Sequence, residues 1–303
     1  YIKYDYFLTQ NFKFTSNFFL KFLIKIMKYI LLFNSIYFKP NYFEKIYRKN
    51  KIDKILIING GYYGGEACNS ALFGWKRYKP NDLPWYNFHS HCKYKKSKIH
   101  FVENYLRNII DKKVLLSSKG FISVSKACLN SLKLRPILKN SKKKFIFNGC
   151  NLEKKSNFLY KKNKFKKISM LAVYEPNKGF QNIIKTMFYL KKLNKNLKLF
   201  IYGDGNKFEK KIIKTDINKY GLNDIITLKK FTPNIEKIYS TSDLIVIPSF
   251  KEAFGYVVVE SFFYKVPVLA YRIKSLNEII KNNYNGYLVK KFDTKLFAKK
   301  IIH

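Results

Sequence analysis

Two carboxylates, Glu252 and Glu260, stand with seven residues between them in the segment DLIVIPSFKEAFGYVVVESFFYKVP, residues 243–267. The apolar run Leu244–Ile247 predicts a strand, and a helix is expected to begin near Gly255 and to carry Glu260 in its early turns. Open α/β sheets bind ligands beyond the carboxyl ends of their strands. Amide groups at the start of a helix favour a phosphate. The segment therefore predicts a site for a ligand with both hydroxyl and phosphate groups.

Alternating strand and helix patterns surround this segment and must position it. Strands are expected at 168–174, 197–202, 225–228, 244–247 and 266–270, and helices at 180–193, 206–219, 235–240, 256–264 and 276–281. The first half repeats the pattern more loosely, with strands at 54–59, 84–89, 121–125 and 144–147 and helices at 100–116 and 126–134. Such alternation indicates parallel sheets that are covered on both faces.

The predicted fold class is α/β, with two Rossmann-like doubly wound domains that face each other across a cleft. A length of 303 residues suits two domains. We expect an N-terminal domain at 1–150, a polar, lysine-rich linker at 151–167 and a C-terminal domain at 168–303. Because the chain starts at Tyr1 and stops at His303 inside a predicted helix, we expect that both ends are missing and that the N-terminal domain is incomplete.

A glycine cluster, Gly60, Gly61, Gly64 and Gly65, follows the strand expected at 54–59. An apolar strand that enters such a cluster is typical of substrate-binding and nucleotide-binding loops, because glycine lets the backbone approach a ligand closely. A plain turn has the same composition. The sequence leaves a substrate loop and a turn as alternatives.

The charge of the chain is extreme, at +41 from 60 basic and 19 acidic residues, and five of the basic residues are arginines. Lys, Asn, Ile, Phe and Tyr all have AT-rich codons, so biased base composition would explain this charge as well as an anionic partner would. Nucleic acid is not an expected partner, because no binding motif is present and specific recognition favours arginine. An anionic membrane surface suits a lysine-rich chain better.

The four cysteines are scattered without a C-x-x-C pair, which is typical of reduced thiols in a cytoplasmic protein. No secretory signal is recognised at the start of the sequence. No cluster of His, Asp or Glu has ligand spacing, so no metal site is predicted. We therefore expect a cytoplasmic protein without a metal.

The apolar segment at 17–38 permits two interpretations. Its longest uncharged run, 29–38, is shorter than the ~20 residues that span a bilayer. Lys21, Lys25 and Lys28 fall on one helical face. An amphipathic helix at a membrane interface has this pattern, and so has a domain helix that packs one side on a sheet. The strand expected at 54–59 favours the domain helix, and a peripheral position at the inner face of the membrane is the alternative.

A series of motifs runs in order along the second half of the chain. They are Glu175–Phe180 with a Lys-Gly turn, Ile201–Gly205 ending in Gly-x-Gly, Asp243–Ser249, the E-x7-E pair Glu252 and Glu260, Pro267–Ala270, and Asn277–Ile280 with Asn285–Gly286. This series resembles the C-terminal domain of glycosyltransferase family 4, the retaining transferases with the GT-B fold. The first half resembles the family more loosely, at Phe121–Lys126, at Phe145–Gly149 and at Asn87–His89.

The resemblance implies a role for each matching residue. Glu252 would bind hydroxyl groups of the donor sugar, and Glu260 would bind the ribose of a nucleotide-sugar donor. Lys178 would hold the diphosphate, since it adds a positive charge at a helix start. The donor-binding set implied by the resemblance also includes Gly203, Ala253, Phe254 and Gly255.

His89 would lie across the cleft near the reacting sugar, so Glu252 and His89 are the expected catalytic residues, although a structural histidine is an equal alternative at 89. The resemblance implies retention at the anomeric carbon and no metal or other cofactor. One position departs from the family, because Val173 stands where many members place an arginine on the diphosphate. Either Lys229 or Lys230 replaces that cation, or donor binding is weakened.

The predicted function is a retaining glycosyltransferase that moves a sugar from a nucleotide-sugar donor to a hydroxyl acceptor. A lipid-linked glycan or a surface-polysaccharide precursor is the expected acceptor. One alternative is a GT-B sugar-nucleotide epimerase or phosphorylase, which analysis of the reaction products would separate from a transferase. The other is an inactive scaffold that binds an anionic membrane or nucleic acid through its lysines, with strongly salt-sensitive binding.

Overall fold

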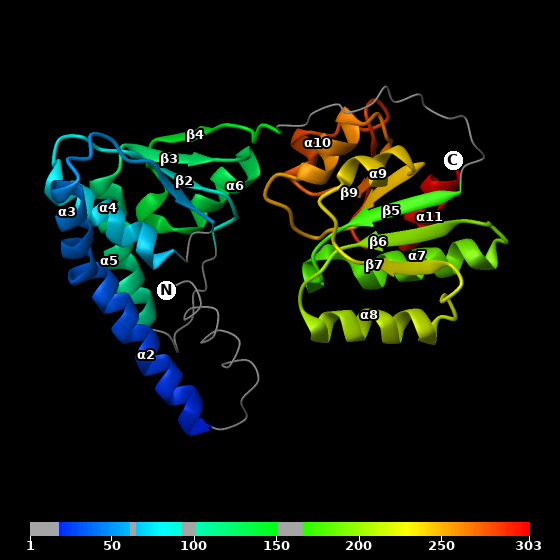
Figure 1. The fold of residues 1–303 in the computed structure, drawn as a ribbon, viewed down its shortest axis with the longest axis horizontal. Coiled ribbons are helices and arrows are strands. Elements are labelled where there is room, and N and C mark those ends of the chain that lie inside the picture. The colour runs from blue at the N-terminus through cyan, green and yellow to red at the C-terminus, as the bar shows by residue number, and fades with distance from the viewer. Residues whose placement is uncertain (1–17, 61–64, 93–100, 151–165) are drawn as a thin grey trace. The chain divides into compact units, whose positions relative to one another are not determined.

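The computed structural model describes residues 18–60, 65–92, 101–150 and 166–303 of the chain (Figure 1). The chain forms two compact units. Unit 1 comprises Tyr1–Val124 and Cys128–Ile146, and unit 2 comprises Ser125–Ala127 and Phe147–His303. Each unit has a parallel sheet and a core of its own. The linker predicted at 151–167 lies almost wholly outside the described residues.

Unit 1 is built on a four-stranded parallel sheet in the order β1-β2-β3-β4. The strands are β1 (Ile57–Asn59), β2 (Trp85–Phe88), β3 (Gly120–Ser123) and β4 (Lys143–Phe145). The helices are α2 (Phe18–Tyr37), α3 (Lys39–Lys49), α4 (Glu66–Tyr78) and α5 (Phe101–Ser117), with 3-10 turns at η2 (Ser131–Leu134) and η3 (Pro136–Leu138). The short helix α6 (Lys126–Asn130) begins in unit 2 and ends in unit 1. The helix expected at 126–134 is thus divided into a short helix and a 3-10 turn.

Aromatic side chains fill the core of unit 1. Trp75 on α4 and Tyr86, Phe88 and Phe121 on the sheet are fully buried. α2 packs one side on this unit, where it buries Leu32 and Ile36. The segment at 17–38 therefore forms a domain helix, but it packs on the helices α3, α4 and α5 rather than on a sheet as the favoured interpretation expected. None of the described helices is both long and apolar enough to cross a membrane.

Unit 2 contains a six-stranded parallel sheet in the order β10-β9-β8-β5-β6-β7. Its strands are β5 (Lys167–Leu171), β6 (Lys198–Tyr202), β7 (Ile226–Lys229), β8 (Leu244–Ile247), β9 (Val268–Tyr271) and β10 (Tyr287–Val289). The chain builds β5, β6 and β7 outward in one direction, and then returns to build β8, β9 and β10 in the other. The strand order therefore reverses between β5 and β8, which is where open α/β sheets bind ligands.

Helices cover both faces of this sheet, and each face has its own apolar cluster. The first cluster includes residues of α7 (Phe180–Lys192), α8 (Lys207–Lys219) and α11 (Thr294–Ile302), and the second includes residues of α9 (Ile235–Ser240) and α10 (Tyr256–Phe263). Along β8, Leu244 and Val246 join the first cluster, whereas Ile245 and Ile247 join the second. This alternation explains why the strand is apolar throughout. The predicted α/β fold class with parallel sheets is confirmed.

The prediction of a helix at 276–281 was wrong, because only the 3-10 turn η5 (Leu276–Glu278) forms there. An earlier 3-10 turn, η4, spans Pro176–Lys178. The Asn285 side chain accepts a hydrogen bond from the Lys281 amide at 2.7 Å and donates one to the Ile279 carbonyl at 3.2 Å. These bonds satisfy backbone groups that a longer helix would have paired, so the chain turns instead.

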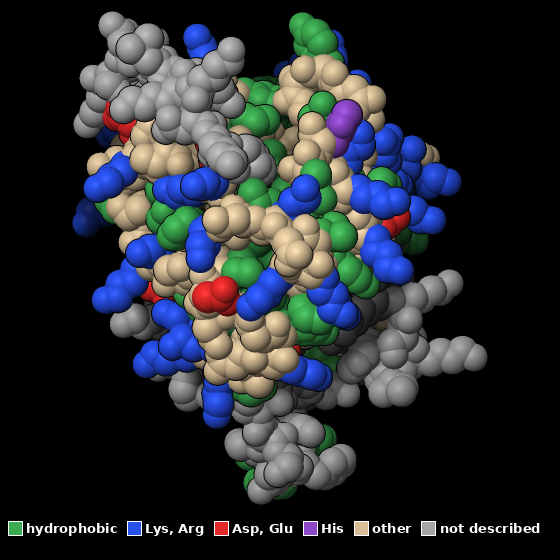
Figure 2. Space-filling model, turned by 90° about the vertical axis from the view of Figure 1, so that its right-hand side faces the viewer, with side chains coloured by type: hydrophobic (Ala, Val, Ile, Leu, Met, Phe, Trp, Pro, Cys, Tyr) green, Lys and Arg blue, Asp and Glu red, His purple; other side chains and the backbone are tan. Residues whose placement is uncertain are grey.

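On the face that Figure 2 shows, basic side chains are spread out rather than gathered in one place. Figure 2 shows Lys and Arg across the whole visible face with few Asp or Glu among them. This distribution does not indicate a binding site for a partner. Biased base composition and an anionic partner therefore both still explain the positive charge.

We expect Gly179→Ala to lower the free energy of unfolding of unit 2 by about 3 kcal/mol or more. Gly179 has φ +76°, and a Cβ there would lie 2.0 Å from the Pro248 carbonyl oxygen. The left-handed conformation costs about 1–2 kcal/mol for other residues, and the contact adds to it. Urea unfolding followed by far-ultraviolet circular dichroism measures the loss, while the fluorescence of Trp75 and Trp85 reports unit 1.

Gly221→Ala is the matched control, because Gly221 has φ +61° but nothing within 4 Å of its would-be Cβ. It should lose about 1–2 kcal/mol from its conformation alone. Equal losses for the two variants would contradict the close contact at Gly179.

Candidate functional site

The loops that follow β5 and β8 meet at the point where the strand order of unit 2 reverses. Lys178, in the 3-10 turn after β5, forms an ion pair with Glu252, in the loop after β8, with 2.8 Å between Nζ and Oε1. The two side chains are 16% and 18% exposed. Two residues that the sequence analysis singled out separately are thus direct partners in a mostly buried contact.

Backbone contacts hold these two loops together independently of the ion pair. The Phe250 amide donates to the Asn177 carbonyl at 2.8 Å. Gly179 packs directly against the Pro248 carbonyl, and only glycine fits there. The Ser275 hydroxyl donates to the Glu252 carbonyl at 2.7 Å. Lys178 and Glu252 are therefore presented by a preformed frame.

Gly203 has a structural reason to be glycine. It lies just beyond β6, and a Cβ there would lie 2.0 Å from the Ala172 carbonyl oxygen. Beyond this contact, the Tyr174 amide donates to the Asp204 carbonyl at 3.0 Å. The loops after β5 and β6 are thereby joined at the same edge of the sheet. The predicted donor-binding role of Gly203 stays a prediction.

Helix α10 begins after Gly255, which has φ +109°. A Cβ at this position would lie 2.6 Å from Leu276 Cδ2, so the turn depends on glycine. Phe254 is 5% exposed and contacts the rings of Phe147 and Tyr256 with centroids 5.9 and 5.4 Å away. The Phe254 side chain therefore anchors the loop, and only its backbone, like that of Ala253, can contribute to ligand binding.

Glu260 lies on α10 and has a partner that the sequence analysis did not find. The Tyr239 hydroxyl, from α9, donates to Glu260 Oε2 at 2.6 Å. Burial raises the pKa of Tyr239 above its ordinary value of 10.0, and the nearby Glu260 carboxylate raises it further. Tyr239 also stacks on Tyr264, with ring centroids 5.1 Å apart. No signal in the sequence singles out Tyr239 among the 24 tyrosines of the chain.

Lys229 and Lys230 are the candidates to replace the arginine that many family members have at the position of Val173. Val173 is half exposed after β5. Lys229 and Lys230 are exposed at the end of β7, and β6 separates β7 from β5 in the sheet. Both lysines are therefore at the correct edge of the sheet but not on a strand next to β5. Their proposed substitution for arginine stays a prediction.

The other predicted residues belong to unit 1. His89 directly follows β2, and its amide donates to the Asn59 carbonyl at 3.0 Å. Gly65 has φ +72° at the start of α4 and lies against the Asn59 side chain, whereas Gly60 has open space around it. Gly61 and Gly64 lie outside the described residues. The catalytic role of His89 and the substrate-loop interpretation of the glycines stay predictions.

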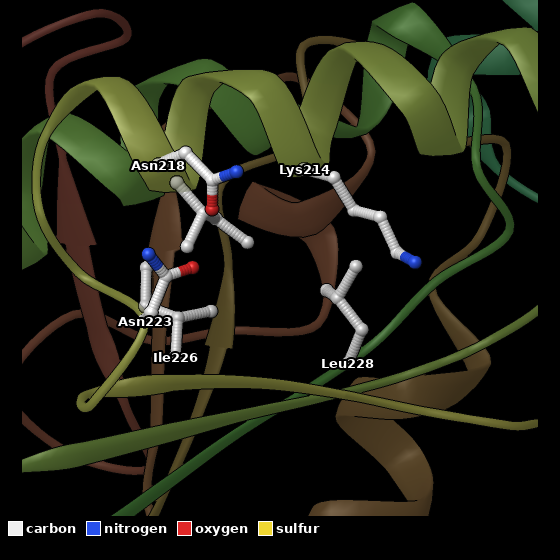
Figure 3. A pocket seen from close by; sticks show the side chains of 6 residues that line it. Lys214, Asn218, Asn223, Ile226 and Leu228 are labelled. Carbon is white, nitrogen blue, oxygen red and sulfur yellow. The ribbon is translucent and has the colours of Figure 1, made fainter.

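A pocket of about 330 Å³ lies elsewhere in unit 2, between α8 and β7. Figure 3 shows Lys214, Asn218 and Asn223 at its polar side and Ile226 and Leu228 on the strand beneath. None of the predicted site residues lines it. Within the described residues, no group of three or more His, Cys, Asp or Glu is placed to hold a metal ion.

Comparison with known proteins identifies the family that unit 2 resembles. Residues 151–303 match the family model described as glycosyl transferases group 1. An uncharacterized glycosyltransferase of Methanocaldococcus jannaschii is 30% identical over 61% of this chain and 49% of its own length. The poly(ribitol-phosphate) alpha-N-acetylglucosaminyltransferase of Staphylococcus aureus is 25% identical over 91% of this chain and 54% of its own length.

Among solved structures, an Anabaena protein in complex with UDP and glucose matches with a TM-score of 0.59 and 19% identity, over 78% of this chain and 65% of that one. This likeness shows the fold, which is that of two Rossmann-like domains. The chain spans about half the length of the curated relatives it matches.

We expect Tyr239→Phe to lower the free energy of unfolding by about 1 kcal/mol near neutral pH, because it removes the hydrogen bond to Glu260. This difference from the wild type should shrink as the pH rises above 10.0, the ordinary tyrosine pKa. There, Tyr239 ionises in the unfolded chain but resists ionisation when folded, so only the wild type loses this stability.

Urea unfolding at a series of pH values measures both effects. Tyr284→Phe is the control, since the Tyr284 side chain is 84% exposed in the same unit, and it should match the wild type at each pH. A difference between wild type and Tyr239→Phe that is constant with pH would contradict the raised pKa.

Proposed function

The chain belongs to the group 1 glycosyl transferases, whose family model covers half of it, and we propose that it transfers a sugar from a nucleotide-sugar donor to a hydroxyl group of an acceptor. We assign it to the retaining enzymes of family 4, because the ordered motifs from Glu175 to Gly286 resemble that family. The epimerase, phosphorylase and scaffold alternatives have no comparable support.

The observation that carries this proposal is the ion pair between Lys178 and Glu252 at the reversal of the strand order. An ammonium group has three donors, so Lys178 can hold Glu252 and still donate to a phosphate oxygen. Its positive charge would stabilise the nucleoside diphosphate as it leaves the sugar. The second oxygen of Glu252 can accept hydrogen bonds from sugar hydroxyls. Neither residue has to change its protonation state.

Glu260 would bind the ribose of the donor. Tyr239 donates to Oε2 of Glu260, which fixes the carboxylate and lets Oε1 accept a hydrogen bond from a ribose hydroxyl. Tyr239 is in this view a positioning residue. On the side of unit 1, we propose that His89 acts near the reacting sugar and that the loop at Gly60–Gly65 contacts substrate, on the resemblance alone.

For the acceptor we propose a glycan, either lipid-linked or a precursor of a surface polysaccharide. The Staphylococcus aureus relative is named for transfer to poly(ribitol phosphate), which is a polymer with hydroxyl groups. UDP-sugars are the first donors to test, because the Anabaena structure holds UDP and glucose. We further propose a cytoplasmic enzyme that works at the inner face of the membrane.

Glu252→Ala and Glu260→Ala should each weaken donor binding by about tenfold to a hundredfold. A hydrogen bond to a charged group contributes about 1.5–3 kcal/mol, and 1.4 kcal/mol is tenfold in affinity. Titration calorimetry with a panel of UDP-sugars and other nucleotide sugars measures binding, and release of the nucleoside diphosphate measures turnover.

Glu209→Ala on α8 removes a carboxylate of the same unit outside the candidate site and should bind donors as the wild type does. The proposal would fail if Glu252→Ala and Glu260→Ala kept both nucleotide-sugar binding and transfer. Release of the sugar with inverted anomeric configuration would refute the retaining assignment alone.

We also propose that transfer needs no metal, since Lys178 and the amides around Ala253 supply positive charge for the diphosphate. Turnover should therefore be the same in EDTA as in Mg²⁺, within about twofold, when product release is followed at saturating donor. Loss of turnover in EDTA that Mg²⁺ restores would contradict this part of the proposal.

A further inference from the structure

Helix α2 carries an apolar stripe that faces outward from unit 1. The stripe follows a three- and four-residue spacing, so its members lie along one side of the helix. They comprise Phe19, Phe22, Ile26, Ile30, Phe33 and Tyr37, which we call the α2 stripe. Phe22 and Tyr37 are 53% and 39% exposed, near opposite ends of the helix.

Packing among the described residues of unit 1 leaves this stripe largely exposed. The opposite side of α2 already contacts the unit, where Leu32 and Ile36 are 4% and 0% exposed. α2 is the longest described helix of the unit, and its first turns lie beyond the ends of α3 and α5 (Figure 1). The core-facing and outward-facing sides are therefore both apolar, which an ordinary amphipathic domain helix is not.

The size of the stripe is unusual for a surface exposed to water. Its three phenylalanines are each about half exposed and alone present on the order of 300 Å² of aromatic surface. Isolated exposed apolar residues are common, but contiguous patches beyond a few hundred Å² mark sites that bind a partner. The spacing of the stripe along 20 residues extends it over about 30 Å, the length of the helix.

A basic group borders one end of the stripe, and α2 holds no acidic residue. Lys113 on α5 places Nζ 4.7 Å from the centre of the Tyr37 ring and donates to the Ile36 carbonyl at 3.3 Å. Burial lowers the pKa of Lys113, and the charge of Arg77 nearby lowers it further. Lys113 thus lies at one end of the stripe, and the charge of Arg77 acts on it. An anionic group beside them would stabilise both.

We propose that the α2 stripe docks unit 1 on the surface of an anionic lipid bilayer, with α2 lying in the plane of the interface and the neighbouring basic groups at the lipid headgroups. An apolar face combined with Lys and Arg is the pattern of interfacial helices. The inference deepens the proposed function and rests on it in one respect, since docking would bring the enzyme to a lipid-linked acceptor.

A second copy of the chain is a poorer occupant of the stripe. Each chain carries a formal charge of +41, so two copies repel one another. Charge complementarity would need acidic side chains opposite Lys113 and Arg77, and another α2 offers none. The anionic bilayer supplies both the apolar interior and the negative charge.

The test is sedimentation of the full chain with vesicles of phosphatidylglycerol and phosphatidylcholine in equal parts. The double variant Phe22→Ser with Ile30→Ser should bind at least about tenfold more weakly, because it removes two large apolar groups from the buried face. Leu56→Ser with Tyr284→Ser is the matched control, since these side chains are 68% and 84% exposed outside α2. The control should bind as the wild type does. Circular dichroism checks that both double variants are folded.

The outcomes separate docking from donor chemistry. The α2 variant should keep nucleotide-sugar binding in calorimetry, and Glu260→Ala should keep vesicle binding, so either proposal can fail alone. Binding of wild type and α2 variant with equal affinity would overturn the docking surface. Equal affinity for vesicles of pure phosphatidylcholine would overturn the anionic partner. A wild-type dimer in analytical ultracentrifugation that the α2 variant abolishes, without vesicle binding, would assign the stripe to a second copy.

Discussion

The pairing of β5 with β8 is the constraint on which the candidate site depends. Ile168 and Ser169 of β5 lie in register with Leu244 and Ile245 of β8, although more than seventy residues separate them along the chain. Because both strands are parallel, their carboxyl ends open at the same edge. The loops that follow are then forced together, and Lys178 meets Glu252. Without this pairing, the two charged residues would be unrelated positions in the sequence.

Close backbone packing fixes the geometry of the two loops that carry Lys178 and Glu252. At Gly179 and at Gly203, a carbonyl oxygen of a neighbouring loop occupies the space where a side chain would begin. Such contacts leave the loops little freedom, so Lys178 and Glu252 are held before any ligand arrives. Taking two charges largely out of water costs free energy, which their mutual attraction offsets only in good geometry. A frame that fixes the geometry is therefore a condition for keeping this pair.

The two units suggest a division of work. Unit 2 holds the charged groups proposed for the donor, at the edge of a sheet that is buried on both faces. Unit 1 carries α2, one side of which completes a core while the other shows an apolar stripe to solvent. At one end of this stripe, Lys113 lies over the rings of Tyr37 and Phe73. A membrane-linked acceptor would join the two roles.

Much of the fold was predictable because strand and helix periodicities are local properties. The strand at 244–247 and the helices at 180–192 and 256–263 agree with their predicted positions to within one residue. The turn at Leu276–Glu278 was predicted wrongly as a helix, because the Asn285 side chain that competes for its backbone groups is not visible in a periodicity. The motif series likewise placed Lys178, Glu252 and Glu260 in one functional domain. By itself, then, the sequence determined the α/β class, most elements of unit 2 and the residues with suitable chemistry, but it did not reveal α3, α4 or β10. Tertiary structure alone decided that Lys178 pairs with Glu252, that Tyr239 fixes Glu260, that Phe254 serves the core and that one side of α2 stays exposed. These are contacts between residues far apart in the chain, and their geometry depends on how strands pair and helices pack, which no local pattern of residues encodes.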